Sequence, residues 1–170
     1  MKYKHTFRML ILVIFILLIF VYKNGLGISK KNLEKDARES QQINSSWDCK
    51  KDISDDLAAM LFYNSALDKH TFSAYENRKG LSFGYFFRHG GNASAINREI
   101  ALLNFNEKGK IVFSLNKLNI SKIAWDEGNE SKEFFVNNND PIVLILPSNS
   151  NNIIAYDNDN TPIDIVIMAN

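Results

Sequence analysis

Residues 71–89 read TFSAYENRKGLSFGYFFRH, and this stretch predicts the fold class. Large apolar side chains recur at alternate positions on both sides of 78–80, the pattern of two antiparallel strands joined by a tight turn. In the second strand, 81–89, aromatic residues fall on both faces, which indicates a central strand or a strand that keeps one aromatic face for a partner. The candidate interaction surface consists of Phe72, Tyr75, Phe83, Tyr85, Phe86 and Phe87.

Short apolar runs separated by Asn-, Asp- and Gly-rich turns continue to the C-terminus. Residues 111–115 alternate as a half-buried strand would, with Val112 on the expected solvent face. Residues 142–146 (IVLIL) are apolar on both faces, so we expect Val143 and Leu144 to lie in the innermost strand. Turn signals at intervals of roughly 8–12 residues predict a mainly β, antiparallel β-sandwich-like domain. Residues 95–105 fit a helix or a strand equally well.

One helix is expected at the N-terminal end of this domain. Ser54 is a suitable N-cap, and the acids Asp55 and Asp56 would lie in the first turn, where the helix dipole favours them. The residues that follow, 57–67, carry apolar side chains at helical spacing. The preceding segment, 29–42 (SKKNLEKDARESQQ), has both charge signs and no apolar stripe, which predicts a solvated stalk.

Residues 9–22 read MLILVIFILLIFVY without a charged side chain. A helix without a polar face favours hydrocarbon, and at about 1.5 Å per residue it covers roughly 21 Å of a core about 30 Å thick. This length fits a signal peptide cleaved after the small residues of 25–27, or a short anchor whose Arg8 and Lys23 reach the headgroups. Because Lys23 and Asn24 interrupt the cleavage region, the sequence favours an uncleaved transmembrane or signal-anchor helix.

The charges around this helix predict its orientation. Lys2, Lys4 and Arg8 lie close before it, and long C-terminal domains cross a membrane largely regardless of charge. The N-terminus is therefore expected in the cytoplasm, with the chain single-pass in the cell membrane, or secreted if the N-terminal segment is cleaved. The expected division is a cytoplasmic basic tail (1–8), a transmembrane helix (9–22), a polar stalk (23–53) and an extracytoplasmic β-rich domain (54–170).

Composition and motifs exclude several classes of site. The net charge of +1, mixed along the chain, is not that of a nucleic-acid-binding protein, and one cysteine, Cys49, allows no internal disulfide. Asp157 and Asp159 begin like a calcium loop, but Pro162 stands at the glycine position, so a plain hairpin turn is expected. No cofactor is expected.

Two histidines, His70 and His89, end the strands of the aromatic hairpin. If the loop between the two strands had two or four residues, both histidines would lie on one face of the sheet and could form a weak metal site. A three-residue loop would place them on opposite faces. Two histidines at strand ends are more often solvated, so we expect no metal.

No Gly-x-Ser-x-Gly elbow, His-Glu-x-x-His helix or phosphate-binding glycine loop occurs in the chain. We therefore expect a non-enzymatic, membrane-anchored, extracytoplasmic binding or interaction domain. Its expected partners are membrane lipid, through the helix, and an envelope protein or polymer, through the aromatic hairpin. The alternative is a small extracytoplasmic hydrolase acting on envelope polymers. A cleft with converging Asp, Glu or His would favour the hydrolase, and an aromatic patch without one would favour binding.

Overall fold

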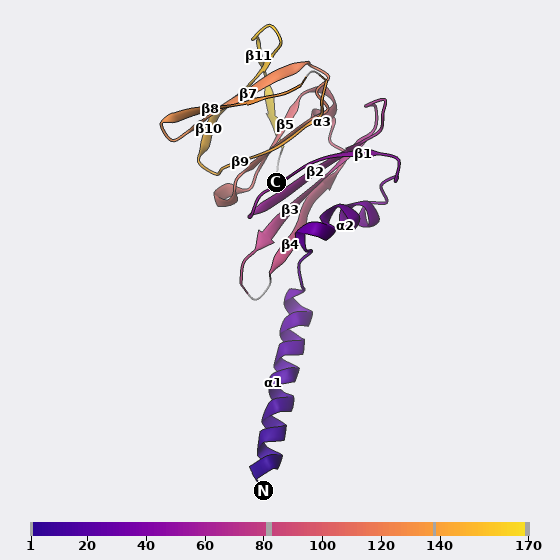
Figure 1. Cartoon of the computed structure of the whole chain (residues 1–170), viewed down its shortest axis with the longest axis vertical. Helices are drawn as coiled ribbons and strands as arrows, with labels where there is room; N and C mark the ends of the chain where they lie inside the picture. The colour runs from indigo at the N-terminus through magenta and orange to yellow at the C-terminus, as the bar shows by residue number, and fades with distance from the viewer. Residues whose placement is uncertain (1, 81–82, 138, 169–170) are drawn as a thin grey trace.

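A computed structural model describes residues 2–80, 83–137 and 139–168, and the fold is mainly β, as the alternating pattern predicted (Figure 1). The strands form three four-stranded sheets of order β1-β2-β3-β4, β12-β5-β6-β9 and β11-β10-β7-β8, and only the β12–β5 pair is parallel among the described strands. The strands are β1 (Asp48–Ile53), β2 (Leu57–Tyr63), β3 (His70–Arg78), β4 (Gly84–Gly91), β5 (Ile100–Asn104), β6 (Lys110–Ser114), β7 (Ile120–Glu127), β8 (Glu130–Phe135), β9 (Ile142–Leu146), β10 (Ser150–Asp157), β11 (Pro162–Ile163) and β12 (Ile165–Ile167). The helices are α1 (Lys2–Asn24), α2 (Leu33–Ser40) and α3 (Ser94–Arg98), with 3-10 turns η1 (Lys30–Asn32) and η2 (Asn106–Lys108).

The middle sheet, β12-β5-β6-β9, is buried on both faces. Leu103 and Phe113 pack against the first sheet, β1-β2-β3-β4. Leu102 and Val112 pack against the third sheet, β11-β10-β7-β8. Successive strand residues point to opposite faces, so a sheet covered on both sides must be apolar throughout. This requirement explains why the middle strands read IALL, IVF and IVLIL.

Because the domain has a third sheet, the predicted positions of Val112 and Leu144 are wrong. Val112 is fully buried in β6, an inner strand, and is not on a solvent face. Leu144 is only half-buried, because β9 is at the edge of the middle sheet. The prediction assumed two layers, and the third layer covers the face that a two-layer sandwich would leave to water.

The helix predicted from Ser54 onward is wrong, because residues 57–63 form strand β2. The Ser54 hydroxyl accepts a hydrogen bond from the Leu57 amide (3.0 Å), so this residue begins the turn between β1 and β2 and does not cap a helix. Leu57 and Leu61 face the middle sheet, and Met60 faces α2. Burial on both faces overrides the helical preference of LAAML.

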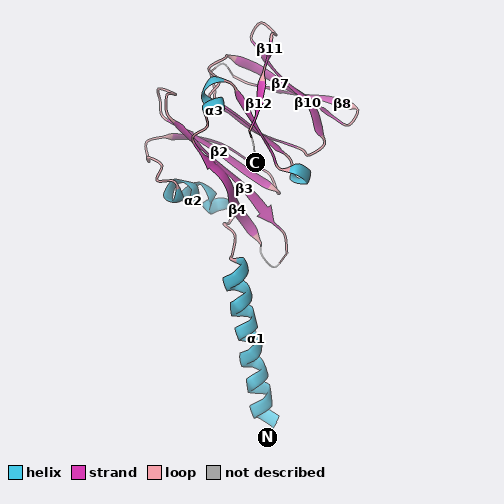
Figure 2. Ribbon diagram, turned by 180° about the vertical axis from the view of Figure 1, so that it is seen from behind, coloured by secondary structure: helices cyan, strands magenta, loops and turns pink. Residues whose placement is uncertain are grey.

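The expected stalk also differs, since α2 packs on the outer face of the first sheet (Figure 2). Leu33 and Ala37 are fully buried there, four residues apart on one side of the helix. The Tyr75 hydroxyl donates a hydrogen bond to the Asp36 carboxylate (2.8 Å), which ties the helix to β3. Two apolar residues on a short helix therefore suffice to make this polar segment part of the core.

The segment 95–105, left open between helix and strand, contains both. Helix α3 ends at Arg98, and β5 begins at Ile100. The Leu115 amide donates to the Ile96 carbonyl (2.9 Å), which holds α3 over the end of β6.

Helix α1 projects from the domain beside the end of the β3–β4 hairpin (Figures 1 and 2). Measured over the described residues, no helix combines the length and the apolar character that a membrane crossing requires. Leu81, which the hairpin prediction included, lies outside the described residues.

Candidate functional site

The structure does not bring the six predicted aromatic residues together on one surface. Phe72 is 7% exposed and packs on Phe113, with ring centroids 5.2 Å apart, between the first and middle sheets. Tyr75 and Tyr85 are buried on the opposite face, next to α2. These three residues are core residues, so their assignment to an interaction surface was wrong. The reason is that each face of the hairpin is covered by a layer that the local pattern does not reveal.

The other three aromatic residues remain at the surface but on different faces. Phe83 and Phe87 are 62% and 47% exposed, and Phe86 is half-buried. Phe87 lies opposite Tyr75 across the hairpin, and Phe86 lies opposite Glu76. The Arg78 guanidinium lies 4.5 Å from the centre of the Phe86 ring. Only a small aromatic area therefore remains, concentrated toward the turn.

His70 and His89 are not neighbours. His89 lies opposite Ala74, four residues along β3 from His70, which corresponds to about 13 Å of strand. A His70 ring nitrogen is hydrogen-bonded to the Ala93 carbonyl (3.0 Å), and His89 packs against the Phe105 ring. Burial lowers the pKa of His70, which favours its neutral form. The two histidines therefore do not form a shared site.

A first cavity, of about 590 Å³, lies between the hairpin and η2. Its central group is Glu76, whose carboxylate accepts from Arg88 (2.7 Å) and from Lys108 (2.6 Å). Burial opposes ionisation of Glu76, but the hydrogen bonds from Lys108 and Arg88 outweigh it and lower the pKa. His89 and Glu107 complete the polar wall. This ion-paired carboxylate joins β3, β4 and η2, and it stays ionised near neutral pH.

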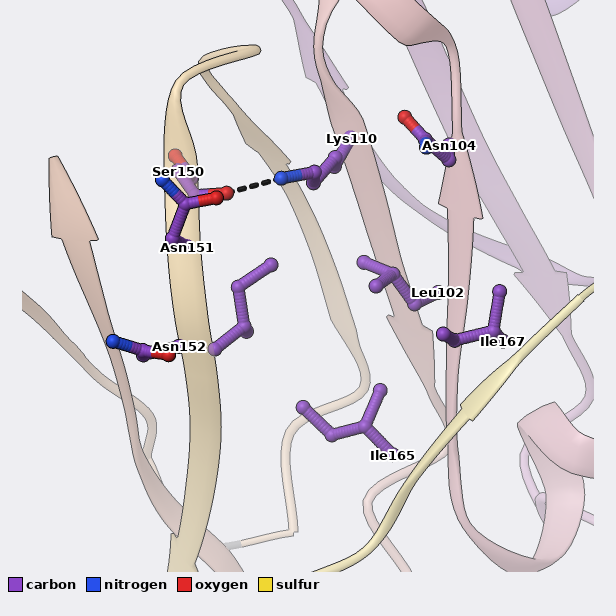
Figure 3. A pocket seen from close by; sticks show the side chains of 9 residues that line it. Leu102, Asn104, Lys110, Ser150, Asn151, Asn152, Ile165 and Ile167 are labelled. Atoms are coloured by element: carbon purple, nitrogen blue, oxygen red, sulfur yellow. Dashed lines mark hydrogen bonds between the residues drawn. The ribbon is translucent and has the colours of Figure 1, made fainter.

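A second cavity, of about 370 Å³, opens between the middle and third sheets and is here called the intersheet slot (Figure 3). Its apolar wall consists of Leu102 on β5 and of Ile165 and Ile167 on β12. Ile167 is 72% exposed, an unusually open position for a large aliphatic side chain. The opposite wall is β10, which contributes the amides of Asn151 and Asn152 and the apolar side chain of Ile153.

Register explains why the slot lies at this end of the sheets. On one face of the middle sheet, Val112 and Leu102 are an apolar cross-strand pair, whereas the next pair on that face is Asn104 and Lys110. This face of the middle sheet therefore changes from apolar to polar at the Asn104–Lys110 pair. The Lys110 amine crosses the slot and donates a hydrogen bond to the Ser150 carbonyl.

The edges of two sheets flank the intersheet slot. Strand β12 is one of the two outer strands of the middle sheet. Strand β11 pairs only with Ala155 and Tyr156, so it does not cover Asn151 or Asn152 of β10. Of the described residues that line the slot, none is Asp, Glu, His or Cys, so the slot offers no acid–base pair. Its chemistry is apolar contact combined with amide and amine hydrogen bonding.

Sequence reasoning did not find the slot, because its residues come from four separate strands. The available signal was a polar residue at the end of each apolar run, Asn104 and Lys110, which alone also fits an ordinary strand end. In the described part of the chain, no group of three or more His, Cys, Asp and Glu side chains is placed to hold a metal ion. Comparisons with protein-family models, curated proteins and solved structures found no match to this chain.

Proposed function

We propose that this chain is a membrane-anchored, extracytoplasmic binding protein whose intersheet slot receives an extended peptide segment of an envelope protein. The observation that carries the proposal is the slot itself, an apolar and amide-lined cavity flanked by the edges of β10 and β12. Strand edges carry backbone N–H and C=O groups that can pair with an added strand. The slot replaces the aromatic hairpin as the proposed contact with the envelope partner.

The two walls of the slot suit the alternating character of an extended peptide. Side chains of a strand point alternately to either side, so every second residue of the peptide would contact Leu102, Ile165 and Ile167. Asn151 and Asn152 offer both donors and acceptors to the polar groups of the peptide. Hydrogen bonds to the main chain supply affinity in this mode, and side-chain pockets supply specificity.

The anchor is proposed from residues 9–22, which carry no charge, and from the basic residues before them. An uncleaved helix is further supported by contacts on its C-terminal side. The Gly27 amide donates to the Phe83 carbonyl (3.1 Å), and Ile28 pairs with Tyr85. Cleavage after Gly27 would remove the first of these contacts from the domain. Carbonate-washed membranes should therefore retain the full-length chain, and protease added to spheroplasts should digest it beyond Lys23.

Peptide binding is tested by site-specific photo-crosslinking in cells. A photoreactive amino acid in place of Ile167 should give a discrete adduct with an envelope protein, and mass spectrometry should place the linkage in an extended segment. The matched control is the same amino acid in place of Phe135, because the two side chains are 72% and 73% exposed on different sheets. Identical adducts from both positions, or none from position 167, would refute the slot as the binding site.

A hydrolase of envelope polymers is the second candidate, favoured by the convergence of Glu76, Glu107 and His89 around the first cavity. The lowered pKa of Glu76 argues against its use as a general acid near neutral pH. Release of soluble fragments from purified cell-wall polymer by the full-length chain, lost in both Glu76→Gln and His89→Ala, would establish hydrolysis in place of binding.

A further inference from the structure

The connection between α1 and the β domain is short and tightly paired. Helix α1 ends at Asn24, and hydrogen bonding to the domain begins at Gly27, whose amide donates to Phe83, so only Gly25 and Leu26 lie between them. Two free residues allow a separation of at most about 10 Å. Ile28 then exchanges two backbone hydrogen bonds with Tyr85, of 2.7 and 2.9 Å. The domain therefore cannot move far from the end of the helix.

Two glycines allow the backbones of the two segments to cross closely at this junction. A β-carbon on Gly27 would lie 2.5 Å from the backbone carbonyl carbon of Gly84, and one on Gly84 would lie 2.7 Å from the Gly27 backbone. Real β-carbons do not approach so closely, so both positions require glycine at this crossing. The crossing lies where β4 begins, and it places the start of β4 close to the C-terminal end of α1 (Figures 1 and 2).

The surface around this junction combines exposed apolar side chains with charges of both signs, since Asp36 and Glu39 lie beside Gly27 and Ile28. Leu26 is 58% exposed and Phe83 is 62% exposed, and they are adjacent through the Gly27–Phe83 hydrogen bond. The Lys79 side chain is 74% exposed, although its amine also pairs with Asp56 at 2.8 Å. Lys30 and Lys31 are exposed on η1, directly after the junction. Exposed aromatic and basic side chains next to an apolar helix are typical of the membrane interface.

We propose that Leu26, Lys79 and Phe83, here called the junction surface, rest in the anionic headgroup layer of the bilayer that holds α1. The contact depends on the membrane anchorage proposed above. Residues 9–22 span roughly 21 Å, less than the hydrocarbon core of about 30 Å, so the bilayer thins locally around the helix and Asn24 comes at the headgroup layer, which is roughly 5–8 Å thick on each side. The reach of Gly25 and Leu26 matches that depth, so Phe83 and Leu26 enter the boundary while lysine amines meet lipid phosphates. The domain is thereby held in one orientation, with Lys79 and Phe83 toward the membrane.

Lipid-specific quenching of tryptophan tests this contact in the full-length chain. Trp47 and Trp125 are first replaced by Phe, and Phe83→Trp is compared with the matched control Phe135→Trp, which is 73% exposed on the third sheet. Both variants are reconstituted in vesicles of brominated phosphatidylcholine and phosphatidylglycerol. Emission from position 83 should fall several-fold more than emission from position 135, and less so without phosphatidylglycerol. Leu26→Trp, with circular dichroism matching that of the parent chain, should repeat the result.

Vesicle flotation separates the two proposals. A chain that floats with the vesicles but shows equal quenching at positions 83 and 135 refutes the junction surface and leaves the anchor intact. A chain that does not float refutes both the anchor and the junction surface.

Discussion

Truncation of Phe113 to alanine tests whether the three sheets form one cooperative core. Phe113 is fully buried in β6, between Ala101 on β5 and Val143 on β9, and its ring packs on Phe72. A phenylalanine buries roughly 150–250 Å², which at about 25 cal/mol per Å² corresponds to about 4–6 kcal/mol. Measured Phe→Ala costs in cores, about 3–5 kcal/mol, agree with this figure. We therefore expect the free energy of unfolding to fall by about 4 kcal/mol.

The assay is urea unfolding of the full-length chain in a mild detergent, followed by the emission of Trp47 and Trp125. Trp47 packs beside α2 and Trp125 packs in the third sheet, so the two report opposite ends of the layers. With a slope of about 2 kcal/mol per M, the midpoint should shift by about 2 M at both tryptophans. Phe135→Ala, which removes the same group from a 73% exposed position, should change stability by less than about 0.5 kcal/mol. Equal shifts for both variants, or different midpoints at the two tryptophans, would refute the layered core.

Three further predictions follow from individual contacts. Burial and the nearby Glu34 raise the pKa of Cys49 to about 12. Iodoacetamide at about pH 8 should therefore modify this thiol many-fold more slowly in the folded chain than in the urea-unfolded chain. Equal rates would contradict the raised pKa of Cys49. The pKa of Glu76 is lowered on folding, so its stabilisation is full above its ordinary value of about 4.3 and is lost as the pH falls through the folded value. Glu76→Gln should therefore destabilise the chain at neutral pH and converge with the parent in acid, as measured by urea unfolding across pH. Gly84→Ala and Gly91→Ala both place alanine at positive φ, which costs roughly 1–3 kcal/mol each. Only the new β-carbon at position 84 would lie within 3 Å of backbone atoms. Gly84→Ala should therefore lower the melting temperature more than Gly91→Ala.

The strands were predicted where the local pattern and the tertiary environment agree. The pairing of β3 with β4 was predicted from alternating residues on either side of 78–80, although Arg78 proves to be a residue of β3 that pairs with Gly84. A turn at 157–162 was also predicted, and the Asp157 carboxylate accepts hydrogen bonds from the Asp159 and Thr161 amides at 2.8 Å. These features depend on near neighbours in sequence, which a single chain displays directly.

Prediction failed where burial depended on a distant layer. The segment 57–67 has helical spacing, yet β2 is a strand because the middle sheet and α2 cover its two faces. Tyr75 and Tyr85 resemble an exposed aromatic face until α2, from a segment expected to be a solvated stalk, is placed over them. The intersheet slot was not predicted for the same reason, since Leu102, Lys110 and Asn151 meet only through strand register.

The sequence by itself determined the class of this protein, a mainly β domain of short antiparallel strands preceded by an uncharged apolar stretch. It did so because residue alternation and turn chemistry act over a few residues and are visible in one dimension. Only the tertiary structure decided that there are three layers, that Phe72 and Val112 are core residues, and that a slot opens between the second and third sheets. The physical reason is that an apolar surface is buried only when a second surface packs against it. Whether an apolar face becomes core or contact surface depends on which distant segment covers it, and the chain reveals that only when folded.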